Sequence, residues 1–322
     1  MSKKLLNEIK MGGNGCSSYL GSVDGVLRAA GLWNEDFYKL AGMTGIAFHF
    51  IVHEQVCPSG VTVYDWQQKH FTMIDKIGVQ SEVFQYYYNN GLNTYDKVLQ
   101  LAVQRIKDSI DRGKGVVIWA PTPILEFGII TGYDDDDQVF FVEDCSCTGD
   151  ADPLLYKNIG KADAPILFYQ IFYEREDVDY KKVYLQSLDF AVKEWEKEFH
   201  MNPHYKSGRK AYHNLINALE KGDYNSFGLS YIVFSYSKAK ECIARYLDFL
   251  KDQGGIFSGL ERAVQLYKEI DEKYNKMEEL IPFTGPGTEI DQGLVPDVKS
   301  LCKEVFELEE KAVDFIKEIL NK

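Results

Sequence analysis

A cysteine near the beginning of the chain is well placed for nucleophilic chemistry. Cys16 follows the turn-forming run Gly13-Asn14-Gly15 and opens a segment whose apolar residues recur at helical spacing as far as Ala30. A helix N-terminus carries partial positive charge, which lowers the pKa of a thiol placed there. Cys16 is therefore a candidate nucleophile. The alternative is a small buried residue that packs the start of the helix.

Two histidines form a second candidate group. The i, i+4 spacing of His49 and His53 would place both on one face of a helix, as in some metal sites. No acidic partner pattern accompanies them, and the six cysteines (16, 57, 145, 147, 242 and 302) contain no CxxC pair. We expect no metal and no bound cofactor, and we place both histidines in the core or in a pocket wall.

The elements that must position these residues change character along the chain. Helices are predicted over 16–30, over 35–40 with a stop at Gly42, and over 94–113, and 56–66 is predicted as strand and turn. Four β-rich runs follow, separated by turn signals: 115–121, 126–133, 138–145 and 165–173. From about residue 179 the spacing is helical throughout. We predict an α+β fold with a helix-plus-antiparallel-sheet domain at 1–178 and an all-helical domain at 179–322.

Composition narrows the classes of partner. The 322-residue chain is 45% hydrophobic and has a formal net charge of −13, which repels phosphate backbones and anionic lipid. We therefore expect neither nucleic acid nor a membrane as partner. There is no signal-peptide core and no apolar run of 18 residues, so a cytoplasmic protein with reduced thiols is expected. The acidic run 134–137 is predicted as a solvated hairpin turn, because it lacks the ligand spacing of a calcium loop.

Three segments together resemble a known family. They are GCSSYLGSVDGVLRAAG (15–31), KLAGMTGIAFHF (39–50) and GVVIWAPTPILEFGIITGYDDDDQVFFVEDC (115–145). They are similar to the N-terminal domain of the butirosin-biosynthesis acyltransferase, which is related to the bacteriocin-processing cysteine peptidases. The resemblance spans roughly residues 12–175 and is most specific in ITGYDDDDQVFFVED. It implies that the first domain has a papain-like fold.

The resemblance also implies roles for individual residues. Cys16 falls at the nucleophile and Asp144 at the acid that orients the base, whereas Glu126 stands where the family has its catalytic histidine. A glutamate can act as a general base where burial raises the pKa of its carboxyl, or it can bind a cationic group of a substrate. One of the two histidines could also replace the missing base. The candidate substrate-binding residues are Asn14, His49, His53 and Tyr133.

Two functions remain open at this point. In the first, Cys16 forms a thioester and the protein is an acyl or aminoacyl transferase, or an amide hydrolase, acting on a small amine-bearing or acyl-carrier-bound substrate. In the second, the papain-like scaffold is a pseudoenzyme that binds a small molecule, and Glu126 holds a cationic group. The helical domain would then close over the ligand or pair two copies as a homodimer.

Overall fold

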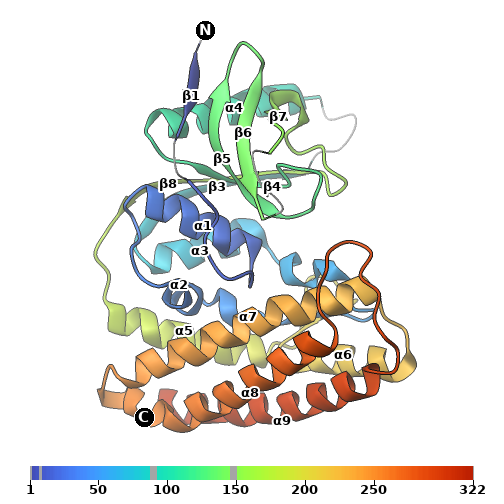
Figure 1. Ribbon diagram of the computed structural model, residues 1–322. Coiled ribbons are helices and arrows are strands. Elements are labelled where there is room, and N and C mark those ends of the chain that lie inside the picture. Colours follow the sequence, from blue (N-terminus) through green and yellow to red (C-terminus); the bar gives the residue numbers. More distant parts are fainter. Residues whose placement is uncertain (1, 7–8, 88–92, 146–150, 322) are drawn as a thin grey trace. The chain divides into compact units, whose positions relative to one another are not determined.

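The structure, a computed structural model, describes residues 2–6, 9–87, 93–145 and 151–321 (Figure 1). The chain divides into two compact units. The first consists of Met1–Glu35 and Asp65–Val178, and the second of Asp36–Tyr64 and Asp179–Lys322. The sequence analysis also divided the chain after residue 178, but it assigned Asp36–Tyr64 to the first domain.

The first unit is built on an antiparallel sheet, to which the described residues contribute seven strands. The order is β3-β8-β4-β5-β6-β7, and β1 pairs with β5. The strands are β1 (Lys3–Leu5), β3 (Val79–Tyr87), β4 (Val116–Trp119), β5 (Phe127–Asp134), β6 (Val139–Asp144), β7 (Leu154–Leu155) and β8 (Ile166–Arg175). The helices are α1 (Ser18–Ala29), α3 (Trp66–Lys76), α4 (Tyr95–Asp111) and the short 3₁₀ helix η3 (Tyr156–Asn158).

Side chains of this sheet alternate between two covered faces. Ile118 and Ile130 belong to an apolar core that also contains residues of α4. Phe127 points the other way and packs edge-on against Tyr19 of α1, with ring centroids 5.4 Å apart. Figure 1 accordingly shows α4 on one face of the sheet and α1 and α3 on the other. The central strands are apolar on both faces, as expected for a sheet covered on both sides.

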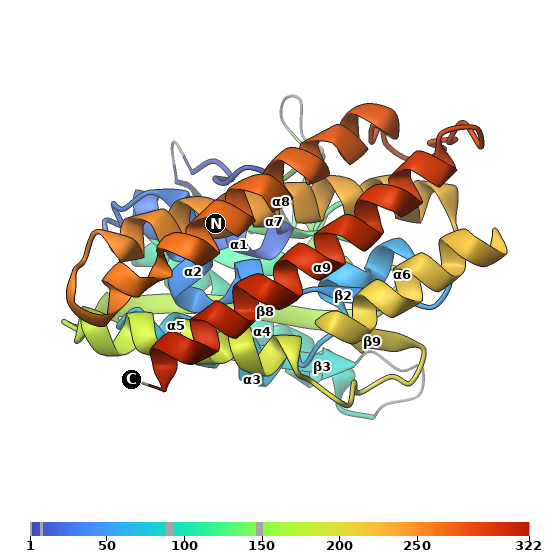
Figure 2. The ribbon, with the colours of Figure 1, turned by 90° about the horizontal axis from the view of Figure 1, so that it is seen from below.

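The second unit is mainly helical. Its elements are α2 (Phe37–Thr44), η1 (Ile46–Phe48), β2 (Ile51–His53), η2 (Pro58–Thr62), α5 (Tyr180–Trp195), β9 (Tyr205–Ser207), α6 (Arg209–Lys221), α7 (Ser226–Lys251), η4 (Gly255–Leu260), α8 (Glu261–Leu280) and α9 (Val295–Leu320). The long helices α7, α8 and α9 lie side by side (Figure 2). β2 and β9 form a separate two-stranded sheet. None of the helices in the described part of the chain is both long and apolar enough to cross a bilayer.

A charged pair lies inside the helical unit. Lys240 Nζ is 2.5 Å from Glu309 Oε1, and the two side chains are 2% and 5% exposed. The hydroxyls of Tyr212 and Tyr267 donate to the same carboxylate, and that of Tyr274 lies 3.2 Å from that of Tyr212. Burial, followed by the Glu309 charge, raises the pKa of all three tyrosines, so they remain protonated donors.

Three local predictions need correction. Residues 58–62 form the 3₁₀ helix η2 instead of a strand, and α3 begins at Trp66, where no helix was expected. Helix α2 does not stop at Gly42 but continues to Thr44, because Gly45, with a φ of 88°, forms its left-handed C-cap, whereas Gly42 lies inside the helix against the Tyr246 ring. The β-rich runs, the helix over 94–113 and the helical second half are confirmed.

Candidate active site

The turn before α1 fixes the backbone of Cys16. Gly13 and Gly15 have φ angles of 85° and 96°, which favour glycine, so the run between Gly12 and Cys16 can turn tightly. Asn14 closes this turn, because its Oδ1 accepts a hydrogen bond from the Cys16 backbone N–H at 3.3 Å. Asn14 therefore shapes the loop. Cys16 itself is 7% exposed and immediately precedes the N-cap of α1.

The segment leading to this turn lies directly on the helix. Gly21 and Gly25 are one turn apart in α1, and a Cβ on Gly25 would overlap the carbonyl oxygen of Lys10. A Cβ on Gly21 would lie 2.8 Å from the carbonyl oxygen of Gly12, whose backbone N–H donates to Gly21 at 2.9 Å. The absence of side chains at Gly21 and Gly25 thus lets the backbone of residues 10–12 lie against α1. This contact keeps the loop that carries Cys16 at the start of the helix.

Glu126 reaches the same helix terminus from far along the chain. The Ser18 hydroxyl donates to Glu126 Oε2 at 2.5 Å, and the backbone N–H of Phe127 donates to Ser18 Oγ at 3.2 Å. Ser18 is the first residue of α1 and lies two positions after Cys16. A carboxylate is stabilised at this place because the helix N-terminus presents unpaired N–H groups and positive charge. The structure therefore brings Cys16 and Glu126 to one end of α1.

Asp144 lies on the opposite face of the sheet from α1. It pairs with Gly128, and a Cβ on Gly128 would lie 3.0 Å from the Asp144 Cβ, so both belong to the face that carries Ile130. The side chain is 3% exposed and accepts a hydrogen bond from the Thr122 hydroxyl. Thr122 belongs to the loop between β4 and β5 that ends at Glu126, where Ala120 N–H donates to the Glu126 carbonyl at 2.8 Å. Asp144 contacts the loop that carries Glu126.

Glu143 is the carboxylate that faces α1 instead. It pairs with Ile129 on the helix-covered face. Its Oε1 accepts from the Met11 backbone N–H at 3.1 Å, and its Oε2 is 2.8 Å from Lys10 Nζ. Glu143 therefore anchors the segment that leads to Cys16. Glu143 was not among the predicted site residues, although two adjacent acidic residues at the end of a strand project their carboxylates to opposite faces of the sheet.

Tyr133 is placed away from this site. It lies at the other end of β5, six residues beyond Phe127, which is about 20 Å at the usual rise of a strand. The ring is 4% exposed within the core under α4, and its hydroxyl donates to Asp111 Oδ1 at 2.9 Å. The structure does not bring Tyr133 together with Cys16 or Glu126.

The two candidate histidines both belong to the second unit. His49 follows η1 and His53 ends β2, so they do not share a helix face. His49 is buried, its Nδ1 is 3.2 Å from Glu194 Oε2, and its ring stacks on Tyr64 at 5.0 Å. His49 is thus a core residue of the helical unit, and His53 lies at the edge of the small sheet.

The first unit has one histidine in its sequence, and it is fully buried. His70 of α3 stacks on Tyr19 of α1 with ring centroids 3.4 Å apart. The Tyr19 hydroxyl donates to Gln170 Oε1 at 2.8 Å. His70 therefore packs against the helix that begins beside Cys16. The sequence analysis missed this contact because the two residues are far apart in the chain.

Among the described cysteines, Cys16, Cys242 and Cys302 are buried, Cys57 is half-buried and Cys145 is exposed. Cys147 lies outside the described residues. The chain matches no known protein-family model, and no curated protein matches its sequence. The papain-like resemblance therefore stays a prediction that rests on the segments quoted for it.

Proposed function

We propose that the first unit is a papain-like scaffold whose cysteine carries out acyl transfer to, or amide hydrolysis of, a small amine-bearing or acyl-carrier-bound molecule. In this proposal Cys16 is the nucleophile and Glu126 accepts its proton. Asp144 acts through Thr122, by holding the loop that ends at Glu126. The supporting observation is the Ser18–Glu126 hydrogen bond, which brings a carboxylate from residue 126 to the helix terminus beside Cys16.

The proposed step balances without a cofactor. The thiol proton passes to the Glu126 carboxylate while sulfur attacks the acyl carbon of the substrate. A C–S bond forms, the bond to the leaving amine or carrier thiol breaks, and the leaving group takes the proton back from Glu126. An incoming amine or water then releases the acyl group and restores the thiol. The N–H groups at the start of α1 favour negative charge during the attack.

The reactivity of the Cys16 thiol tests this proposal. We would measure iodoacetamide labelling against pH by peptide mass spectrometry, with the exposed Cys145 of the same chain as the internal reference. Labelling of Cys16 is expected to be faster than that of Cys145 near neutral pH, and to change several-fold in Glu126→Gln. Glu174→Gln is the matched control, because Glu174 is 78% exposed and pairs with Lys114 at the surface, so its loss should leave the labelling unchanged.

A second function is favoured by the low exposure of Cys16 and by the burial of His70. In this alternative the unit is a non-catalytic binding protein, and the Glu126 carboxylate holds an ammonium group of a ligand. Cys16 would then label no faster than Cys145. A simple alkyl diamine would raise the melting temperature of the wild-type protein and have no effect on Glu126→Gln. Slow labelling together with this thermal shift would replace the acyl-transfer proposal.

A further inference from the structure

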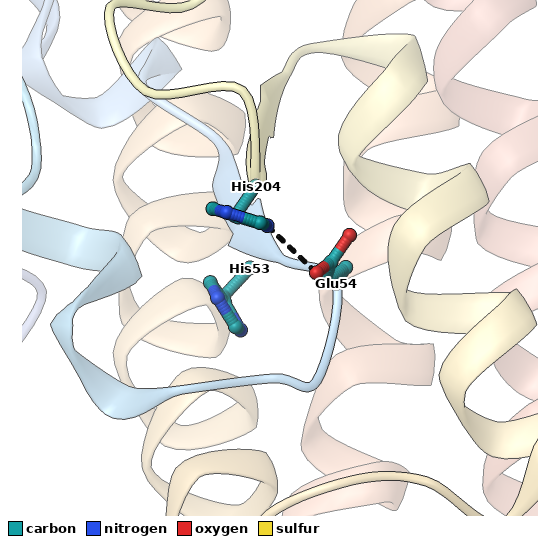
Figure 3. A group of neighbouring side chains, drawn as sticks. All are labelled: His53, Glu54 and His204. Carbon is teal, nitrogen blue, oxygen red and sulfur yellow. Dashed lines mark hydrogen bonds and ion pairs between the residues drawn. The ribbon is translucent and has the colours of Figure 1, made fainter.

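Three potential metal ligands meet at the edge of the small sheet in the second unit. They are His53, Glu54 and His204, and one ligand atom from each lies within 4.8 Å of the other two. Figure 3 shows the three side chains close together: His53 ends β2, Glu54 follows it, and His204 directly precedes β9. We propose that His53, Glu54 and His204 form a binding site for a zinc ion.

The pairing of β2 with β9 creates this juxtaposition. His53 is opposite Tyr205 in the antiparallel register, so Glu54 is opposite His204 one step further on. The backbone N–H of Glu54 donates to the His204 carbonyl at 2.9 Å and extends the ladder by one residue. Directly opposed residues in an antiparallel pair project to the same side. Glu54 Oε1 accordingly lies 2.7 Å from His204 Nδ1.

His53 joins the other two residues where the strand ends. Its ring centroid is 6.0 Å from that of His204 and 4.8 Å from that of Tyr205, which packs edge-on against it. The Gln55 backbone N–H donates to His53 Nδ1 at 3.0 Å, which fixes the ring orientation. A ring held in this way keeps Nε2 as its remaining nitrogen for a ligand bond.

An outer contact holds the two strands together behind the site. Asn214 of α6 donates from Nδ2 to the Val52 carbonyl at 2.9 Å and to the His204 carbonyl at 3.4 Å. This side chain therefore ties the residue before His53 to His204. Outer groups that hold ligand-bearing backbone in place are a regular feature of metal sites.

The donor set selects the class of metal. Two imidazoles and one carboxylate suit zinc and other borderline divalent ions, whereas calcium and magnesium prefer oxygen ligands alone. Glu54 and His204 are 54% and 60% exposed, so an ion can enter and keep water in its remaining positions. A metal bound at Nδ1 of both rings would replace the contact between His204 and Glu54 and the hydrogen bond from the Gln55 N–H to His53.

Zinc titration of the metal-free 322-residue chain against a chromophoric chelator tests the proposal. One equivalent is expected to bind per chain. His53→Gln, Glu54→Gln and His204→Gln should each weaken binding at least tenfold, because each removes a direct ligand. His213→Gln, in an exposed histidine of the same unit that lies outside the cluster, should bind as the wild type does. Equal affinity in the wild type and the His53 and His204 variants would overturn the proposal.

Two further measurements exclude thiol binding and misfolding. Cobalt substitution should give a spectrum without a thiolate charge-transfer band. Such a band, lost in Cys57→Ser, would overturn the proposal, since Cys57 Sγ contacts Ser59 Oγ, which in turn contacts the Tyr205 hydroxyl. If a variant is unstable without metal, the histidine side-chain NMR signals of the wild-type protein show whether zinc binds at this site. Zinc should shift those of His53 and His204 and leave that of His213 in place, and the reverse pattern would count against the site.

Discussion

Each unit has a carboxylate that is set back from the surface, but Glu309 of the helical unit is buried whereas Glu126 of the first unit is half-buried. In the helical unit, Glu309 is 5% exposed and is surrounded by one ammonium and two tyrosine hydroxyls. In the first unit, Glu126 is half-buried at a helix terminus, where its Oε2 accepts a hydrogen bond from the Ser18 hydroxyl. The Glu309 carboxylate is the more deeply buried of the two.

This difference helps to separate a carboxylate that stabilises the fold from one that can react with or bind a substrate. A buried charge that is fully surrounded by complementary groups has no position left for a substrate, so its role is to specify packing. A carboxylate at the start of a helix, with a thiol-bearing loop beside it, still has access to solvent and to the helix N–H groups. We therefore expect changes at Glu309 to alter the stability of the helical unit, and changes around Glu126 to alter the reactivity of Cys16.

The largest effect is expected from breaking the buried pair. Lys240→Met leaves the Glu309 charge uncompensated, and Glu309→Ala leaves the Lys240 charge uncompensated. Each should lower the free energy of unfolding by about 3–5 kcal/mol. The double variant Lys240→Met with Glu309→Gln should recover much of this loss, because a neutral amide still accepts hydrogen bonds from the tyrosines. Urea denaturation followed by hydrogen exchange in α7 and α9 peptides measures these changes.

An exposed glutamate on the same helix supplies the control for this experiment. Glu307 lies two residues before Glu309 on the solvent side of α9, so Glu307→Ala should change stability by no more than about 0.5 kcal/mol. If the single variants at positions 240 and 309 behave like Glu307→Ala, the network does not specify the packing of the helical unit, and the contrast with the first unit is lost.

A smaller effect is expected from the glycine face of α1. Replacing glycine by alanine inside a helix normally stabilises it by about 1 kcal/mol. Gly25→Ala should instead destabilise the first unit by about 1–3 kcal/mol, because the added methyl overlaps the Lys10 carbonyl. It should also alter iodoacetamide labelling of Cys16, since the segment before the cysteine must move. Gly21→Ala, with a looser contact, should do less, and a stabilised Gly25→Ala protein would contradict the close packing.

Much of the fold could be predicted because its signals are local. The β-rich runs and the amphipathic helices carry their period in the sequence. Helix α3 was missed although Asp65 offers an N-cap, its side chain accepting from the Gln68 N–H at 3.2 Å. The assignment of Asp36–Tyr64 to the second unit depends on contacts such as that of Gly42 with Tyr246, which no local pattern encodes.

Within the candidate site, the sequence could predict only the positions that depend on residues nearby in the chain. Cys16 was expected at a helix start and is found there. Whether Glu143 or Asp144 faces that helix depends on the pairing of Glu143 with Ile129, and a shift of one residue would exchange them. Ser18 was overlooked because its partner, Glu126, is 108 positions away. Strand register and contacts between distant residues arise from the tertiary fold, so local patterns in the sequence do not predict them.

Two adjacent serines separate helix stability from site geometry. Ser17 is the N-cap of α1 and accepts from the Leu20 N–H at 3.3 Å, so Ser17→Ala should cost about 1 kcal/mol of stability. Ser18→Ala should cost a similar amount, about 1 kcal/mol, through its lost hydrogen bonds. It should in addition change the labelling of Cys16, because it releases the Glu126 carboxylate. Equal labelling in the two variants would show that the Ser18–Glu126 contact is merely structural.

The smallest effect concerns a carboxylate near the surface, in the turn between β5 and β6. The hydrogen bond from Lys107, at 2.6 Å, holds the pKa of Asp135 below its usual value, with Ser2 adding to the effect. A depressed folded-state pKa stabilises the protein above the unfolded value of about 3.9, and this stabilisation is lost as the pH falls through the folded pKa. The stability difference between wild type and Asp135→Asn should therefore be constant above about pH 5 and shrink on acidification. Thermal melts from pH 3 to pH 7 measure it, with Asp137→Asn in the same exposed turn as the control. If the stability difference between wild type and Asp135→Asn stays constant down to pH 3, the ionised Asp135 carboxylate does not stabilise the fold through Lys107. The Lys107–Asp135 pair would then contribute no more than an ordinary solvent-exposed ion pair.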